Sequence, residues 1–240
     1  MYGLSVGVAL ACMFAVYLGA AVQASIGIGL GMIAAPMLAF ADPDFIPATI
    51  MLAVLPLTFT IAFADRSHIE RRDVAFALVG RVPGVILGAL IVAALSDRVL
   101  AVMVAVSVLV AVGASLTGRL FRPTDISLVI AGLASGFAGT TTGVGGPPMA
   151  LTYQNSDPAT MRSTISAFFA IGSLLSLAAL ALAGEVGNRQ LQLTGLLLPS
   201  VVLGVITARL LKDRLNPAIV RPAVLVVCTI AAGALLIETF

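Results

Sequence analysis

The sequence has little charge, a single histidine, two cysteines and no tryptophan among its 240 residues. Charged side chains make up 10% of it, against about 25% in soluble globular proteins. Cys12 and Cys228 lie far apart inside long apolar runs, so neither a disulfide nor a cysteine metal site is expected. His68 belongs to no His, Cys or carboxylate cluster with the spacing of metal ligands. We therefore expect no metal ion and no cofactor.

Basic residues are too few and too scattered to form a nucleic-acid surface. The formal net charge is +2, and no run of Lys or Arg is interleaved with aromatic side chains. We expect no nucleic-acid partner. Enzyme activity is not expected either, because no acid or base stands near the Ser and Thr residues of the motifs described below to activate a hydroxyl.

Apolar residues take the place of the missing charges. They make up 60% of the chain, and the mean hydropathy is +1.13. This composition is typical of a polytopic membrane protein. The first apolar run, residues 2–24, follows no basic residue and is too long for a signal-peptide core. We expect it to remain as a membrane-spanning helix.

One sequence pattern occurs twice, 116 positions apart. The first copy reads Gln-Ala-Ser-Ile-Gly-Ile-Gly-Leu-Gly-Met from Gln23, and the second reads Gly-Thr-Thr-Thr-Gly-Val-Gly-Gly-Pro-Pro from Gly139. Identities at this offset are Gly27 with Gly143, Gly29 with Gly145, Pro83 with Pro199, Gly88 with Gly204, Asp97 with Asp213 and Arg98 with Arg214. The pattern predicts one transmembrane domain, 1–240, made of two homologous halves: repeat 1 at about 1–118 and repeat 2 at about 124–240.

Each half contains four long apolar runs and one short run. A helix needs about 20 apolar residues to cross a hydrocarbon core. The long runs are 2–24, 46–64, 74–95 and 99–116, then 126–138, 161–183, 191–211 and 218–237. The short runs are 26–40 and 143–153, and the run 126–138 is itself shorter than its counterpart. We therefore predict an all-α fold in which each half has four long transmembrane helices and a short broken segment after a glycine turn.

The short runs decide the symmetry of the two halves. If they cross the membrane, the second half is inverted relative to the first; if they fold back, the halves are parallel. With crossing, Arg98 and Arg189 fall on one side and ten basic residues on the other. The ten are Arg66, Arg71, Arg72, Arg119, Arg122, Arg162, Arg209, Lys212, Arg214 and Arg221. Because basic residues gather on the cytoplasmic side, this division favours inverted repeats with both termini outside.

The glycine turns are expected to lie inside the membrane, because at about 1.5 Å per residue the short runs cannot reach both surfaces. Glycines at alternate positions expose successive N–H groups, and a helix that starts after them adds the positive end of its dipole. Such a turn suits an oxyanion. The expected backbone donors are Gly27, Gly29, Gly143, Gly145 and Gly146. The expected polar side chains near them are Gln23, Ser25, Thr140, Thr141, Thr142 and Gln154.

Three of these interpretations have alternatives. Small residues four apart, such as Gly27 and Gly31, also bring membrane helices together without binding anything. Gln154 either contacts the substrate or lies at the membrane interface. Arg81, within the run 74–95, is either a fixed charge that attracts an anion or a side chain that reaches the headgroups.

Acidic residues are missing from the interior of every apolar run. A cation pathway or a proton pump normally needs an embedded carboxylate, so this absence favours an anionic substrate. The coupling ion is left unassigned.

The glycine motifs resemble those of the TauE/SafE family of sulfite and organosulfonate exporters. The resemblance rests on Gly27-Ile-Gly-Leu-Gly followed by Pro36, on Gly143-Val-Gly-Gly-Pro, and on Met161-Arg-Ser-Thr, and it covers almost the whole chain. It implies a multi-pass permease of the bacterial cytoplasmic membrane that moves sulfite, sulfonates such as sulfoacetate, or related organic anions, usually outward. One departure is Ala150-Leu-Thr-Tyr-Gln, where the family usually has a proline after the second motif.

We therefore expect a secondary transporter, and specifically an exporter, that moves a small sulfur-containing anion by alternating access. An ion gradient would drive it, because the sequence has no ATP-binding motif. The alternatives are a passive anion channel, a permease for another small organic anion, and a membrane scaffold whose glycines only pack helices.

Overall fold

The computed structural model describes residues 4–116, 122–211 and 217–239, without the side chains of 211 and 217–221. Arg119, Lys212, Asp213, Arg214 and the side chain of Arg221 lie outside this part. The regular structure described is entirely helical, which confirms the predicted all-α fold. The α-helices are α1 (Val6–Ile26), α2 (Leu30–Ala41), α3 (Ala48–Ala64), α4 (Arg71–Val92), α5 (Asp97–Leu116), α6 (Asp125–Thr142), α7 (Gly146–Tyr153), α8 (Pro158–Leu182), α9 (Asn188–Leu211) and α10 (Pro217–Thr239).

Seven helical segments of the described part are long and apolar enough to cross a membrane: α1, α3 with the short turn before it, α4, α5, α8, α9 and α10. The prediction of four long spans in each half is therefore confirmed in the first half. In the described part of the second half, three helices are long and apolar enough. The run 126–138 falls within α6, which does not qualify because Gly, Ser and Thr occupy much of its C-terminal half.

The two predicted breaks occur at the glycine motifs. The helix α1 ends at Gly27, whose φ of 89° is left-handed, and α2 begins at Leu30. The helix α6 ends in the same way at Gly143, with a φ of 74°, and α7 begins at Gly146. A β-carbon disfavours this conformation, so glycine at these two positions lets the chain leave one helix and start the next.

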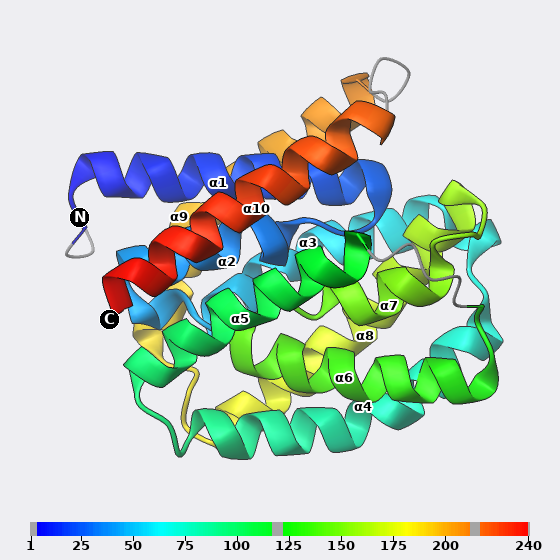
Figure 1. Cartoon of the computed structure of the whole chain (residues 1–240), viewed down its shortest axis with the longest axis horizontal. Helices are drawn as coiled ribbons and strands as arrows, with labels where there is room; N and C mark the ends of the chain where they lie inside the picture. Colours follow the sequence, from blue (N-terminus) through cyan, green and yellow to red (C-terminus); the bar gives the residue numbers. More distant parts are fainter. Residues whose placement is uncertain (1–3, 117–121, 212–216, 240) are drawn as a thin grey trace.

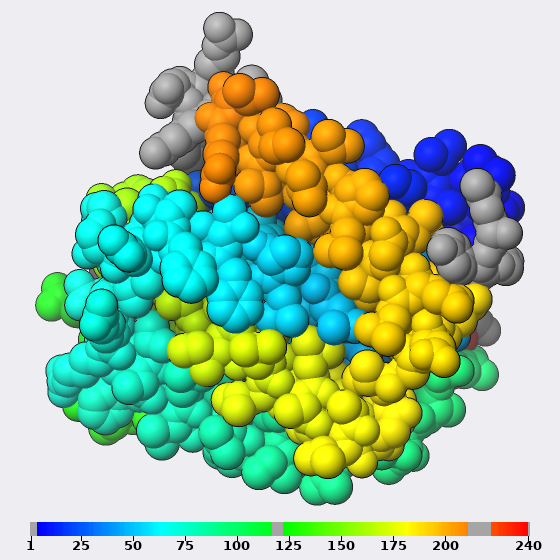
Figure 2. Space-filling model, turned by 180° about the vertical axis from the view of Figure 1, so that it is seen from behind, coloured from blue at the N-terminus to red at the C-terminus, as the bar shows by residue number. Residues whose placement is uncertain are grey.

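Small residues bring α4 and α6 into backbone contact. A β-carbon at Gly80 would lie 1.9 Å from the carbonyl oxygen of Val129, and one at Gly132 would lie 1.9 Å from that of Ala77. This close approach places the middle of α4, where Arg81 lies, inside the molecule. On the face of the molecule that is turned away from the viewer in Figure 1, α3 lies between α8 and α9 (Figure 2).

Both termini lie at the same end of the molecule (Figure 1). The helix α1 runs away from this end, whereas α6 runs toward it (Figure 1). The end of α3 and the starts of α4 and α8 lie at the opposite end (Figure 1).

Replacing Gly132 with Ala tests the contact between α4 and α6. The added methyl group has no room, so we expect the free energy of unfolding to fall by about 1–3 kcal/mol. Gly113→Ala is the matched control, because a β-carbon there meets no atom within 4 Å. Unfolding of the purified proteins in detergent measures the difference, and equal stability of the two variants would contradict the packing described.

Candidate functional site

The two glycine turns touch each other although they are more than 100 residues apart in the chain. A β-carbon at Gly31 would lie 2.3 Å from the carbonyl oxygen of Gly143. A β-carbon at Gly146 would be in ordinary contact, at 3.4 Å, with a methyl carbon of Ile28. The starts of α2 and α7 therefore meet in the interior of the molecule.

A small cavity of about 40 Å³ lies where the turns meet. A single water molecule needs roughly 10–15 Å³ on this measure, so the cavity has room for a few heavy atoms. Predicted residues that line it are Gln23, Gly29, Arg81, Gly143, Gly145 and Gly146. Ser173 and Phe169 of α8 also line it and were not predicted.

Arg81 is completely buried beside this cavity. The ion pairs found among the described residues use other arginines, Arg72, Arg162 and Arg189, and none of them includes Arg81. The side chain is enclosed within the protein, whereas the headgroup alternative requires it to reach the surface of the molecule. A buried cation without a carboxylate is costly, and in a membrane protein it points to a functional role.

The contacts of Arg81 satisfy its guanidinium group only in part. It donates hydrogen bonds to the hydroxyls of Ser135 and Ser176 at 3.3 and 3.4 Å, which are long for hydrogen bonds. It also lies over the rings of Phe168 and Phe169, at 4.7 and 5.5 Å from their centroids. Its Nε has no hydrogen-bond partner in the part of the chain that the structure describes. The group therefore retains donor capacity and positive charge for a ligand.

Two glycines make the space that Arg81 occupies. A β-carbon at Gly172 would lie 2.1 Å from the Nε of Arg81. One at Gly136 would lie 2.6 Å from its carbonyl oxygen. The position of the guanidinium is thus set by missing side chains on α6 and α8.

Hydroxyl groups connect Arg81 to the second glycine turn. Ser135 donates a hydrogen bond of 2.6 Å to the carbonyl oxygen of Gly145 while it accepts one from Arg81. On the other side, Thr140 and Ser176 share a hydrogen bond of 2.9 Å. Thr140 was expected beside this turn, whereas Ser135 and Ser176 were not predicted from the sequence. For Ser176 a signal exists, because Ser173 and Ser176 lie one helical turn apart within an apolar run.

Backbone N–H groups at both helix starts complete the site. The first intrahelical bond of α2 runs from Ile33 to Gly29, so the amides of Gly31 and Met32 precede it. The amide of Leu30 is already bonded, at 3.0 Å, to the side-chain oxygen of Gln23. In the second turn Gly145 and Gly146 come before two prolines, which have no N–H. These helix starts offer the positive ends of two dipoles to the cavity.

Two of the predicted backbone donors are not available. The N–H of Gly27 donates to the carbonyl oxygen of Gln23 at 2.8 Å, and that of Gly143 donates to Gly139 at 2.9 Å. Both bonds close the last turn of a helix, so the expectation that these two amides face an anion is wrong. The two glycines shape the breaks, and Gly27 also packs on the backbone of Arg162.

Four predicted side chains lie outside the Arg81 cavity. The hydroxyls of Ser25, Thr141 and Thr142 donate to carbonyl oxygens of their own helices, at 2.7–2.9 Å. They do so because a helical Ser or Thr reaches the carbonyl oxygen one turn earlier. Ser25 and Gln154 line a second, larger cavity instead.

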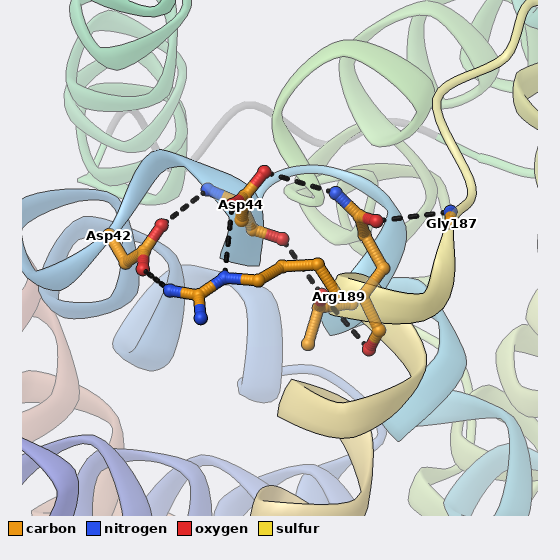
Figure 3. A network of polar contacts seen from close by, with 6 residues as sticks. Asp42, Asp44, Gly187 and Arg189 are labelled. Carbon is orange, nitrogen blue, oxygen red and sulfur yellow. Dashed lines mark hydrogen bonds and ion pairs between the residues drawn. The ribbon is translucent and has the colours of Figure 1, made fainter. Parts of the chain in front are cut away.

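Ion pairs connect distant segments at the two ends of the molecule. Arg189, at the start of α9, bonds to Asp42 and, at 3.2 Å, to Asp44 (Figure 3). Arg162 of α8 bonds to Asp65, which follows α3. The start of α9 lies toward the end that carries the termini, whereas the end of α3 and the start of α8 lie at the other end (Figure 1).

A disulfide between positions 28 and 146 tests whether the glycine turns meet. The β-carbon of Ile28 lies 3.6 Å from the position of a β-carbon at Gly146, within the disulfide range of about 3.5–4.5 Å. We expect the double variant Ile28→Cys, Gly146→Cys, with Cys12 and Cys228 changed to Ala, to form this bond under mild oxidation. Thiol titration and the intact mass measure it. Ile28→Cys alone is the control, and unreacted thiols in the double variant would refute the contact.

Comparison with protein-family models matches residues 12–235 to the family described as Sulfite exporter TauE/SafE. Comparisons with curated proteins and with solved structures give no match. The matched region contains both glycine turns, Arg81 and the residues that bond to it. The match covers nearly all of the chain, and the protein therefore belongs to the sulfite exporter TauE/SafE family.

Proposed function

We propose that the protein is a secondary transporter that exports a small sulfur-containing anion, such as sulfite or an organosulfonate, across the cytoplasmic membrane. The observation that carries this proposal is the fully buried Arg81, which has no ion-pair partner among the described residues and lines the cavity where both glycine turns meet. Membership in an exporter family supports both the transport role and the class of substrate.

The cavity suits an oxyanion for electrostatic reasons. Its lining contains one positive side chain and no carboxylate among the described residues. An anion placed there would supply the missing counterion of Arg81 and accept hydrogen bonds from its guanidinium group. The amides at the starts of α2 and α7 would bind the remaining oxygens from two directions. Ser173 and Gln23 add neutral polar groups beside them.

The arrangement of the helices supports two inverted repeats, at about 1–118 and about 124–240. Gly88 of α4 packs on Thr140 of α6, and its repeat counterpart Gly204 of α9 packs on Tyr17 of α1. In each half, one helix thus packs against the first helix of the other half: α4 against α6, and α9 against α1. The opposite directions of α1 and α6 in Figure 1 fit an inverted relation. In this proposal both termini lie outside, and the basic loop around Arg71 lies in the cytoplasm.

Alternating access would use the ion pairs at the two ends. Each pair joins a residue of the first half to one of the second: Asp65 to Arg162, and Asp42 and Asp44 to Arg189. When one end opens, its pair would separate and the other would hold. The described residues that line the cavity do not indicate which ion is coupled to transport.

Arg81→Met is the most direct variant for the proposed binding role. Methionine keeps much of the side-chain volume but removes the charge, so we expect sulfite binding and transport to fall at least tenfold, since a hydrogen bond to a charged group contributes about 1.5–3 kcal/mol. Arg72→Met is the matched control, because Arg72 is exposed and pairs with Asp125 at the surface. Transport in proteoliposomes measures the effect, and undiminished sulfite flux in Arg81→Met would exclude the proposed site.

Accumulation separates a coupled carrier from the alternative, a passive anion channel. We expect wild-type proteoliposomes, given an ion gradient, to concentrate labelled sulfite above its external level. A channel moves the anion only down its electrochemical gradient, so, with the membrane potential held at zero, a plateau at the external concentration under every imposed gradient would favour the channel. Liposomes that contain Arg81→Met provide the background.

A further inference from the structure

A second cavity adjoins the Arg81 cavity at the first glycine turn. It measures about 320 Å³, whereas the Arg81 cavity measures about 40 Å³. Ile28, Gly29 and Met32 line both cavities. The larger cavity is formed by the ends of α1, α5 and α7 and by parts of α2, α8 and α10. A molecule with its charged end at Arg81 therefore has adjacent space for a larger second part.

The lining of the larger cavity is mostly apolar. Ile26, Leu151, Met161 and Leu225 contribute hydrocarbon surface. The polar residues in the described lining are the neutral Ser25, Ser115, Gln154 and Ser156. Among the described residues this lining contains neither Arg nor Lys, so none of them would be a counterion for a second negative charge desolvated there.

We propose that this larger cavity is a tail subsite, which holds the neutral organic part of a singly charged sulfonate whose head lies against Arg81. The proposal rests on the proposed function and names the substrate more closely. Alkanesulfonates should bind better than dianions of similar length, such as sulfoacetate. Met32, an unbranched and adaptable side chain on the shared wall, is the residue that the organic chain displaces as it passes between the cavities.

A chain-length series tests the tail subsite in the wild-type protein. Calorimetry in detergent would compare sulfite with methane-, ethane-, propane- and butanesulfonate and with sulfoacetate. Each buried methylene should raise the affinity about fourfold. Propanesulfonate should bind more tightly than sulfoacetate. A flat series with sulfite binding intact would overturn the tail subsite and leave the proposed function standing, whereas no binding of any of these anions would count against the proposed function itself.

Leu225→Trp fills the larger cavity from α10. We expect this variant to lose the gain in affinity with chain length and to keep wild-type affinity for sulfite. Val226→Trp is the matched control, because Val226 is the next residue, is 58% exposed and does not line the cavity. If Leu225→Trp weakened the binding of sulfite and of butanesulfonate equally, the larger cavity would be a passage for both anions, and the tail subsite would be refuted.

Discussion

A guanidinium group enclosed in the interior of a membrane protein constrains everything around it. Removing an ion from water costs several kcal/mol even after the protein relaxes. Arg81 recovers part of this through two long hydrogen bonds to serines and through two phenylalanine rings, each worth about 2 kcal/mol or less. Its Nε is without a partner in the described structure. An anion in the adjoining cavity would supply the missing charge. The uncompensated charge of Arg81 therefore destabilises the protein without a ligand and favours the form with a bound anion.

Glycine determines where this charge lies. At Gly172 and Gly136 the missing side chains leave room for Arg81, and at Gly80 and Gly132 they let α4 approach α6. At Gly27 and Gly143 a left-handed backbone ends one helix so that another can begin inside the molecule. The hydroxyl of Ser135 then connects the guanidinium to the second of these turns. Charge, turns and helix packing are therefore parts of one arrangement.

The helices and the two breaks could be predicted because apolar run length and glycine spacing are local properties of the sequence. Arg81 could be singled out for a similar reason, since a lone charge in an apolar run is conspicuous. The contact between Gly31 and Gly143 and the roles of Ser135 and Ser176 are long-range facts that no run or spacing encodes. The donors at Gly27 and Gly143 were misassigned because each helix uses its terminal amide to close its own last turn. Ser25, Thr141 and Thr142 bond to their own helices for a related local reason.

The central claim is that Arg81 and the two helix starts hold the transported anion together. Selenite has the shape and charge of sulfite, and its selenium atom gives an anomalous signal that the sulfur atoms of the protein do not match. A crystal structure with selenite should show one anomalous peak in the Arg81 cavity, with an oxygen within hydrogen-bond distance of the Arg81 guanidinium group and others near the amides of Gly31 and Gly146. A peak beside Arg162 or Arg209, with the Arg81 cavity empty, would contradict the account.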